Sequence, residues 1–304
     1  MTKVEVFAPA KINLCLHVTG KRADGYHLLD TLVAFANIGD TITLSAAVSH
    51  VLDVTGPEAS PELAGNDNIM WQTAARFWAQ DRPLSMHLDK QLPVASGIGG
   101  GSADAAATYR GLLALRAALE GQDAPRDPTF HDAQALMSIG ADVPMCVPSA
   151  PARVQGIGEQ ITPISDFHPY PIVLVNPRIQ VSTPAVFSRL AVKENPGLDP
   201  WPETFEDRDT VLDWLAAQRN DLQAPALQDC PAIAEVLDAL AQEPTCRLAR
   251  MSGSGATCFG LFERVHLAQA ATDAITAAHP DWWVRVGRLN GGSRAAPQLI
   301  RSTT

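Results

Sequence analysis

The stretch SGIGGGSADAA (residues 96–106) places four glycines within five positions, directly before a run of small helix-forming residues. Each glycine loses more backbone freedom on folding than any other residue, so such a cluster needs a structural or chemical reason. A glycine loop that leads into a helix offers free N–H groups and the positive end of the helix dipole. The stretch therefore predicts a turn, a helix behind it and a phosphate cradle at their junction.

Two common phosphate-binding patterns do not fit this stretch. A P-loop needs a lysine after the glycines, and the dinucleotide fingerprint G-x-G-x-x-G fails because Ser102 stands where the last glycine belongs. A tight turn with close helix packing therefore stays open as an alternative. If the loop is a cradle, we expect Ser102 to contact phosphate or Mg²⁺ and Asp104 to help hold the metal. We also expect Gly100 to tolerate no side chain, because a Cβ would block the loop conformation and the approach of phosphate.

Composition limits the class of protein. The 304 residues include 23 Lys and Arg against 33 Asp and Glu, a net charge of −10, and 46% of them are hydrophobic. A chain of this length favours two domains, and the acidic balance argues against a nucleic-acid partner. The five cysteines are irregularly spaced, so we expect neither disulfides nor a zinc site. No apolar run reaches the ~18 residues of a membrane span, so we expect a cytoplasmic protein without a membrane partner.

Hydrophobic periodicity divides the chain near residue 160. Before it, we predict strands at 4–8, 12–18, 31–38, 41–45 and 85–89, and helices at about 68–78, 100–119 and 128–138. After it, we predict strands at 170–175, 247–251, 256–262 and 282–289, with helices at 233–240 and 265–278. The second set has the order β-α-β-β-α-β of a split βαβ unit. The tail after Asn290 is expected to be frayed.

A second glycine group, MSGSGATCFGLF (251–262), accompanies the first. Gly253 and Gly255 are compatible with an ordinary hairpin turn. Together with PAKINL (9–14), however, the two glycine loops form a constellation that a random fold would seldom show.

These stretches resemble the GHMP kinase superfamily. PAKINL is similar to its first motif, LPVASGIGGGSADAA (92–106) to its phosphate loop and SGSGATCF (252–259) to its third motif. The segments APAKINLCLHVTGKRADGYHLLDTL (8–32) and IGADVPMCV (139–147) are more specific. They resemble the members that phosphorylate the 2-hydroxyl of a cytidine diphosphate-linked methylerythritol in the non-mevalonate isoprenoid pathway.

The resemblance implies an α+β fold of two domains. Residues 1–160 would form an ATP-binding, ribosomal-protein-S5-like α/β domain, and residues 161–304 a substrate domain of split βαβ, ferredoxin-like form. It implies ATP and Mg²⁺ as cofactors, a small-molecule substrate, and a monomer or weak homodimer.

The resemblance also assigns the site. Asp142 would be the general base, with Lys11 beside it at the reacting hydroxyl, where phosphoryl transfer needs positioning and electrostatic stabilisation. The substrate-binding residues would be Asn13, Tyr26, His27, Thr183 and Phe187. The ATP-binding residues would be Asn68, Pro93, Gly97, Gly99, Gly100, Gly101, Ser102 and Ala103, and the third glycine motif contributes Gly253, Ser254 and Gly255.

The cytosine would lie between two aromatic rings. We expect Tyr26 and Phe187 to face each other across a cleft, with His27 reading the polar edge of the base. Val33 departs from the family pattern, since an aromatic residue is often found at that position.

Each residue also has an ordinary structural interpretation. Asp142 is suited to capping a helix, Lys11 to a solvated strand end and Asn13 to a turn. The aromatic residues are compatible with a hairpin edge and a core position, and Thr183 with the end of a strand. Two other functions stay open: a homoserine or mevalonate type of GHMP kinase, and a non-catalytic nucleotide-binding or RNA-binding protein.

Overall fold

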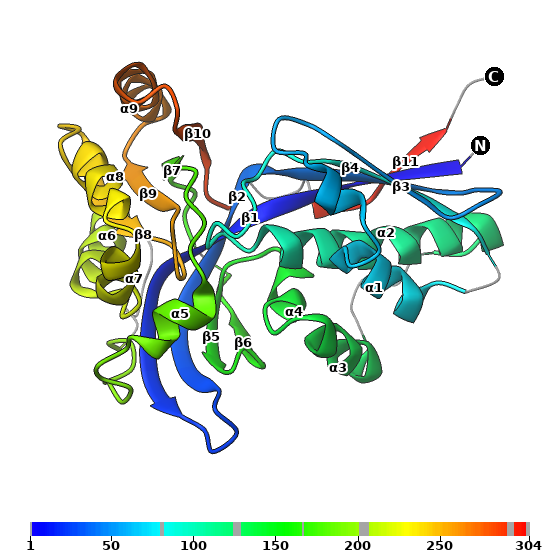
Figure 1. Ribbon diagram of the computed structural model, residues 1–304, viewed down its shortest axis with the longest axis horizontal. Helices are drawn as coiled ribbons and strands as arrows, with labels where there is room; N and C mark the ends of the chain where they lie inside the picture. Colours follow the sequence, from blue (N-terminus) through cyan, green and yellow to red (C-terminus); the bar gives the residue numbers. More distant parts are fainter. Residues whose placement is uncertain are drawn as a thin grey trace.

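The computed structural model describes residues 2–79, 82–123, 129–165, 167–200, 207–290 and 295–301. They form an elongated molecule built around two β-sheets (Figure 1). Two long strands, β1 (Thr2–Lys21) and β2 (His27–Ala46), pair as an antiparallel hairpin that runs through the whole molecule. This hairpin connects the two halves of the structure.

Each long strand unites two strands that the sequence predicts separately. Residues 4–8 and 12–18 belong to β1, and residues 31–38 and 41–45 belong to β2. In β1, the break in the apolar pattern coincides with a register shift between Pro9 and Lys11. Proline has no N–H to donate to the neighbouring strand, so it is tolerated at such a bulge. The strand therefore bends at this point without ending.

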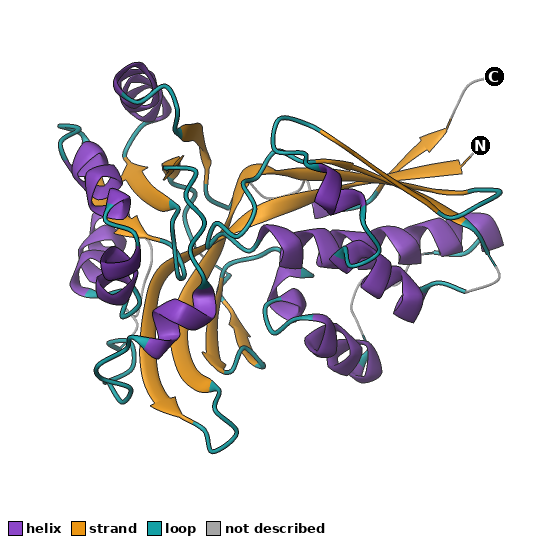
Figure 2. Cartoon of the chain, in the orientation of Figure 1, coloured by secondary structure: helices purple, strands orange, loops and turns teal. Residues whose placement is uncertain are grey.

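The first sheet has seven strands. Its order is β11-β1-β2-β4-β3, and β5 adds to β2 and carries β6. The additional strands are β3 (Val51–Thr55), β4 (Leu84–Asp89), β5 (Ala152–Gly156), β6 (Gln160–Pro163) and β11 (Gln298–Arg301). Helices lie on one face of this sheet (Figure 2). They are α1 (Ile69–Phe77), α2 (Gly100–Glu120), α3 (Phe130–Ile139) and α4 (Val143–Cys146).

Local signals explain where these helices begin. The Asn68 side chain accepts a hydrogen bond from Met70 N and caps α1, as the sequence predicts. A capping box between Thr129 and Asp132 starts α3. Residue 128, where the sequence places the start of α3, lies outside the described residues.

The second sheet has four antiparallel strands in the order β10-β7-β9-β8. The strands are β7 (Pro171–Asn176), β8 (Cys246–Met251), β9 (Cys258–Phe262) and β10 (Trp283–Arg288). With α8 (Ala232–Ala241) and α9 (Val265–Ala278) they form the split βαβ unit that the sequence predicts. Three further helices, which the sequence does not reveal, precede α8: α5 (Thr183–Ser188), α6 (Arg208–Ala217) and α7 (Gln223–Asp229).

The tail corrects one prediction. Residues 298–301 form β11 and pair with residues 2–5 of β1, so this part of the tail is not frayed. The Arg110 side chain also donates a hydrogen bond to the backbone oxygen of Ala295, at 3.0 Å. An unpaired strand edge favours such additions, because its N–H and C=O groups lack partners. Residues 291–294 and 302–304 lie outside the described residues.

The two halves share part of their hydrophobic core. Ile12 and Leu14 from β1 pack in one buried cluster with Ile172, Leu174 and Phe259 from the second sheet. The change from the first sheet to the second falls between β6 and β7. We keep the division into domains at residues 160 and 161 as a prediction, because this shared core and the return of β11 join the halves.

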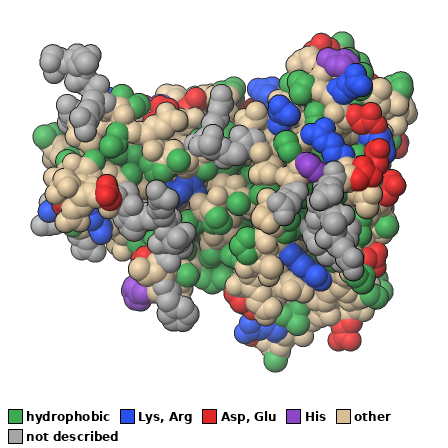
Figure 3. All heavy atoms as spheres, turned by 180° about the vertical axis from the view of Figure 1, so that it is seen from behind, with side chains coloured by type: hydrophobic (Ala, Val, Ile, Leu, Met, Phe, Trp, Pro, Cys, Tyr) green, Lys and Arg blue, Asp and Glu red, His purple; other side chains and the backbone are tan. Residues whose placement is uncertain are grey.

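Charge is distributed over the surface in both signs. On the rear face, basic and acidic side chains lie next to one another over the half that carries the second sheet (Figure 3). Of the helices in the described part of the chain, none combines the length and the apolar character needed to cross a bilayer. The five cysteines are free thiols.

Candidate active site

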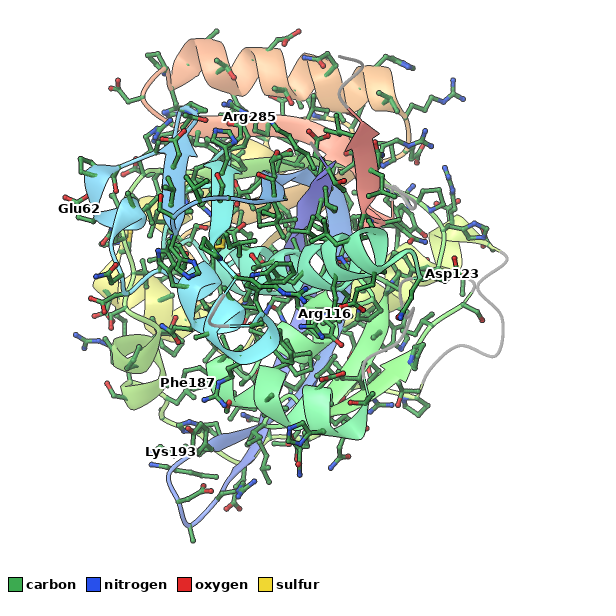
Figure 4. The ribbon with its side chains drawn as sticks, turned by 90° about the vertical axis from the view of Figure 1, so that its right-hand side faces the viewer. Glu62, Arg116, Asp123, Phe187, Lys193 and Arg285 are labelled. Carbon is green, nitrogen blue, oxygen red and sulfur yellow. The ribbon has the colours of Figure 1, made fainter. Side chains whose placement is uncertain are left out.

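A cavity of about 1090 Å³ lies between the two halves. Its walls come from β1 and β2, from the loop before α2, from α4 and α5, and from the loop between β8 and β9. Glu62 and Phe187 both line it, and both are found on the same side of the molecule in Figure 4. Most of the residues assigned from the sequence meet in this one cavity.

The two glycine loops interlock at the centre of the cavity wall. Gly97 has a φ of +75°, and a Cβ there would lie 2.6 Å from the backbone oxygens of Ser252 and Gly255. The Ser252 hydroxyl donates to the Gly97 oxygen at 3.0 Å, and Thr257 N donates to the Ser96 oxygen at 3.1 Å. Only glycine fits this approach without strain, so the first loop is held in shape by the second.

Gly99 is the N-cap residue of α2 and adopts the left-handed conformation, with a φ of +63°. Gly100 corrects our expectation: it lies in the first turn of the helix, and a Cβ there would meet Lys90 Nζ at 3.4 Å and Leu92 at 3.7 Å. The backbone conformation therefore does not exclude a side chain at this position. The steric argument applies to Gly97 and, through its left-handed conformation, to Gly99.

Lys11 and Asp142 form an ion pair at the cavity wall, with Lys11 Nζ 2.6 Å from Asp142 Oδ2. The lysine side chain is 6% exposed and the aspartate side chain 41% exposed, so the carboxylate faces the open cavity. Asp142 stands at the N-cap position of α4, but its side chain makes no capping hydrogen bond. The capping interpretation is therefore wrong for the side chain, which is directed to Lys11 instead.

Asn13 is positioned from two directions. Its Nδ2 donates to Thr31 Oγ1 at 2.9 Å, and its backbone N donates to Ser252 Oγ at 3.1 Å. Among the described residues, Asn13 Oδ1 has no hydrogen-bond partner although it is buried. Because a buried acceptor without a partner is costly, this oxygen is suited to a ligand donor.

One end of the cavity carries the aromatic residues. The rings of His27 and Phe187 stack with centroids 4.8 Å apart and an interplanar angle of 23°. Tyr26 is 58% exposed and also lines the cavity. The expected arrangement, with Tyr26 facing Phe187 and His27 at the edge, therefore differs from the observed one, in which the imidazole covers the Phe187 ring.

His27 is neutral near pH 7, because burial first, and then the charges of Lys21 and Lys193, lower its pKa below 6.5. Its Nε2 is buried and, in the described part of the chain, has no hydrogen-bond partner.

Thr183 Oγ1 lies 2.7 Å from Ser254 Oγ, and this contact connects α5 to the third glycine motif. Val33, in contrast, is fully buried beside α2 and α4 and does not contribute to the cavity wall.

The other end of the cavity is formed around Asn68. This residue lines the cavity, and its Nδ2 donates to the Leu63 oxygen at 2.7 Å. Several of the expected ATP-binding residues line the wall, namely Pro93, Gly97, Gly99, Gly100, Gly101 and Ser102. Ala103 does not, because its side chain is buried in the core and its N–H donates to the Gly99 oxygen. Gly255 also faces away, towards Met251, whereas Gly253 and Ser254 line the cavity.

A buried charge cluster below the phosphate loop was not predicted. Lys90 Nζ donates to Asp40 Oδ2 at 2.7 Å and to Asp104 Oδ2 at 2.8 Å. Burial opposes the charged ammonium, but the two carboxylates outweigh it and raise the pKa of Lys90. Burial also raises the pKa of Asp104, and Asp40 adds to this effect. The sequence gives little indication of this cluster, because a lysine at the end of a strand, such as Lys90, is usually a surface residue.

This cluster affects the prediction that Asp104 helps to hold Mg²⁺. Asp104 directs one oxygen to Lys90, and its Oδ1 is buried without a partner among the described residues. Within the described ranges, no group of three His, Cys, Asp or Glu residues is arranged to hold a metal ion. Ser102 lines the cavity at the first turn of α2.

Comparisons with known proteins show the family of the chain. The family described as GHMP kinases N terminal domain matches residues 68–149, and the family described as GHMP kinases C terminal matches residues 205–281. A relative in Roseobacter denitrificans named 4-diphosphocytidyl-2-C-methyl-D-erythritol kinase is 49% identical over 97% of both chains. A relative of the same name in Ruegeria pomeroyi is 52% identical over 94% of this chain and 99% of its own. The solved structure of a 4-(cytidine 5'-diphospho)-2C-methyl-D-erythritol kinase matches with a TM-score of 0.75 at 31% identity, covering 95% of this chain and 100% of that one.

Proposed function

The chain belongs to the GHMP kinases, and we propose that it transfers the γ-phosphoryl group of ATP to the 2-hydroxyl of 4-diphosphocytidyl-2-C-methyl-D-erythritol. The products are the 2-phosphate and ADP. One observation carries the proposal: an ion-paired carboxylate lies between a glycine cradle and an aromatic end, within a single cavity. The name that the relatives carry supports the choice of acceptor.

Asp142 is the proposed general base. Its exposed carboxylate is suited to accept the proton of the attacking hydroxyl, a contribution typically worth ~10²–10⁴-fold in rate. The neighbouring Lys11 ammonium, 2.6 Å from this carboxylate, is placed to offset negative charge on the transferring phosphoryl group. Asn13 offers Oδ1 to a donor of the same substrate.

The acceptor end is suited to a cytidine diphosphate. His27 and Phe187 provide ring faces, the neutral His27 imidazole provides a buried nitrogen for the base, and Tyr26 and Thr183 complete the wall. Three lysines line the cavity, and within the described residues Lys21 is the one without an ion-pair partner. A free cation near the aromatic end favours an anionic substrate, such as a diphosphate, over a small neutral one.

The nucleotide end is suited to ATP. The free N–H groups of the first turn of α2 would receive its phosphates, and Asn68 would line the adenine site. Ser102 would contact the Mg²⁺ that accompanies the nucleotide. Mg²⁺ is usually held by one or two protein oxygens together with phosphates and water, and the Ser102 hydroxyl at the cavity wall is suited to be one of them. The ion would neutralise charge on the phosphates.

The test is a measurement of ADP release with three acceptors: the cytidine diphosphate-linked methylerythritol, homoserine and mevalonate. We expect turnover only with the first, because the other two have no base to place against the stacked rings of His27 and Phe187. Equal rates with homoserine or mevalonate would refute the assignment of the acceptor. ATP binding without ADP release for any acceptor would instead favour a non-catalytic nucleotide-binding protein.

A further inference from the structure

One short segment of the chain forms the wall at the nucleotide end of the cavity. It comprises residues 58–68 and includes a single-turn 3-10 helix, η1 (Pro61–Ala64), in which no residue is buried. Glu62, Leu63, Asp67 and Asn68 of this segment line the cavity. Because η1 has no buried residue of its own, the position of this wall depends on a few polar contacts at its ends.

Contacts within the first half connect the segment to the phosphate loop. Glu58 N donates to the Lys90 oxygen at 3.1 Å, and Asn68 Nδ2 donates to the Leu63 oxygen at 2.7 Å. Lys90 in turn contacts Asp104 in α2. The first bond connects the Glu58 end of the segment to Lys90, and the second holds Asn68 to η1 within the segment.

A bidentate ion pair connects the same segment to the second half. Arg178 Nη1 and Nη2 donate to the two carboxylate oxygens of Glu58, each at 2.8 Å. The Glu58 side chain is 8% exposed and that of Arg178 is 46% exposed. Two parallel bonds fix orientation as well as distance, and the carboxylate is mostly removed from water.

Arg178 is itself held in position. Its φ is +60°, which is uncommon for a residue with a side chain, and its N–H donates to Asn176 Oδ1 at 2.7 Å. Asn176 Nδ2 then donates to Thr257 Oγ1 at 2.9 Å, and Thr257 N donates to the Ser96 oxygen at the start of the phosphate loop. A continuous set of contacts therefore joins the phosphate loop, the second sheet and the wall at residues 58–68.

We propose that Arg178 is a positioning residue for the nucleotide: through Glu58 it holds the 58–68 wall in the arrangement that binds the base end of ATP. This inference rests on the proposed kinase function. Arg178 does not line the cavity, so it acts through the wall and not by touching ATP. When the pair is broken, the wall occupies the binding arrangement for a smaller fraction of the time, and the apparent affinity falls by that fraction.

The experiment compares Arg178→Gln, Glu58→Gln and the double variant. ATP affinity is measured by calorimetry with Mg²⁺, and KM and kcat are measured with the cytidine-bearing acceptor. Hydrogen exchange reports on residues 58–68. Arg247→Gln is the matched control, because Arg247 also pairs with carboxylates, but its partners Asp209 and Glu263 lie outside the 58–68 segment.

We expect Arg178→Gln to weaken ATP binding about 5- to 30-fold, with kcat at saturating ATP and KM for the acceptor changed by less than about twofold. Exchange in the 58–68 segment should become faster. Glu58→Gln should act in the same direction, and the double variant should lose no more than the stronger single variant, since both changes break one interaction. Arg247→Gln should leave ATP affinity unchanged.

The outcomes separate the two proposals. If the wild-type protein binds ATP and Arg178→Gln binds it equally well, the positioning role is refuted and the kinase assignment stands. If Arg178→Gln lowers the melting temperature and weakens the acceptor as much as ATP, the pair is a general structural contact and the inference is wrong. If the wild-type protein does not bind ATP, both proposals fall together.

Discussion

Replacing Asp142 by asparagine tests the centre of the proposed site. The amide has the shape of the carboxylate and still accepts a hydrogen bond from Lys11, but it cannot take up the hydroxyl proton. We expect kcat to fall about 100-fold or more, which corresponds to about 2.7 kcal/mol of transition-state stabilisation. KM for both substrates should change little, because the carboxylate acts on the reacting proton and not on ground-state binding.

The structure also sets the expected effect of this change on stability. Losing one partner of a fully buried ion pair costs about 3–5 kcal/mol, since the other charge is left without compensation. Here the charge left behind is Lys11, whose side chain is 6% exposed. The Asp142 side of the pair is 41% exposed, however, so water and the retained amide oxygen solvate the ammonium from the cavity. We therefore expect a loss of unfolding free energy of about 1 kcal/mol or less, well below the loss in transition-state stabilisation.

The assay is coupled ADP release at saturating ATP and acceptor, with calorimetry for binding and urea titration for stability. Asp209→Asn is the matched control, because Asp209 is also an ion-paired carboxylate but does not line the cavity. If Asp142→Asn retained turnover within about threefold of the wild type while binding both substrates, Asp142 would be a positioning group and the general-base argument would fail.

Three further outcomes follow from particular contacts. Gly97→Ala should lower stability by about 1–3 kcal/mol and weaken ATP binding, whereas Gly100→Ala should keep the wild-type melting temperature; equal melting temperatures for both would contradict the left-handed strain at Gly97. Phe187→Ala should raise KM for the cytidine-bearing acceptor about 2- to 13-fold and leave KM for ATP unchanged, and the reverse pattern would place the base elsewhere. Burial, followed by the charge of Arg219, lowers the pKa of His17 below 6.5, so the native state binds fewer protons than the unfolded state just below pH 6.5. Stability should therefore fall as the pH drops from 7 through 6.5, as urea titrations would measure, and His17→Gln should reduce this slope; an unchanged slope would contradict the assignment.

The sequence predicts those parts of the fold that have a strong local signal. The helix after the glycine loop, the cap at Asn68 and the βαββαβ order of the second half all follow from periodicity, capping residues and turns. The bulge at Pro9 was read as a break between two strands, because a proline and a change of register look alike in one dimension. Helices α5 and α7, of six and seven residues, are too short to give a clear apolar period, and α6 was missed although it is as long as α8.

The residues of the site were predicted mainly from motifs. The errors in this prediction concern side chains that have more than one neighbour to contact. The ion pair of Lys11 and Asp142 was expected, although 131 positions separate the two residues. His27, and not Tyr26, stacks on Phe187. Which of the two rings does so depends on the direction of side chains at a hairpin end, and a motif does not specify that direction. The contact of Glu58 with Arg178 could not be predicted from the sequence around either residue, since each one alone is typical of a solvent-exposed charged side chain.

The pairing of β11 with β1 has a consequence for synthesis on the ribosome. Strand β1 gains its outer neighbour only when residues 298–301 have been made. Until then, the edge of β1 presents unpaired N–H and C=O groups that other chains can add to. We therefore expect nascent chains stalled before residue 298 to be more sensitive to protease near their first residues than the released protein, and equal protection in both would contradict this. The first sheet is therefore closed only after residue 301 has been made.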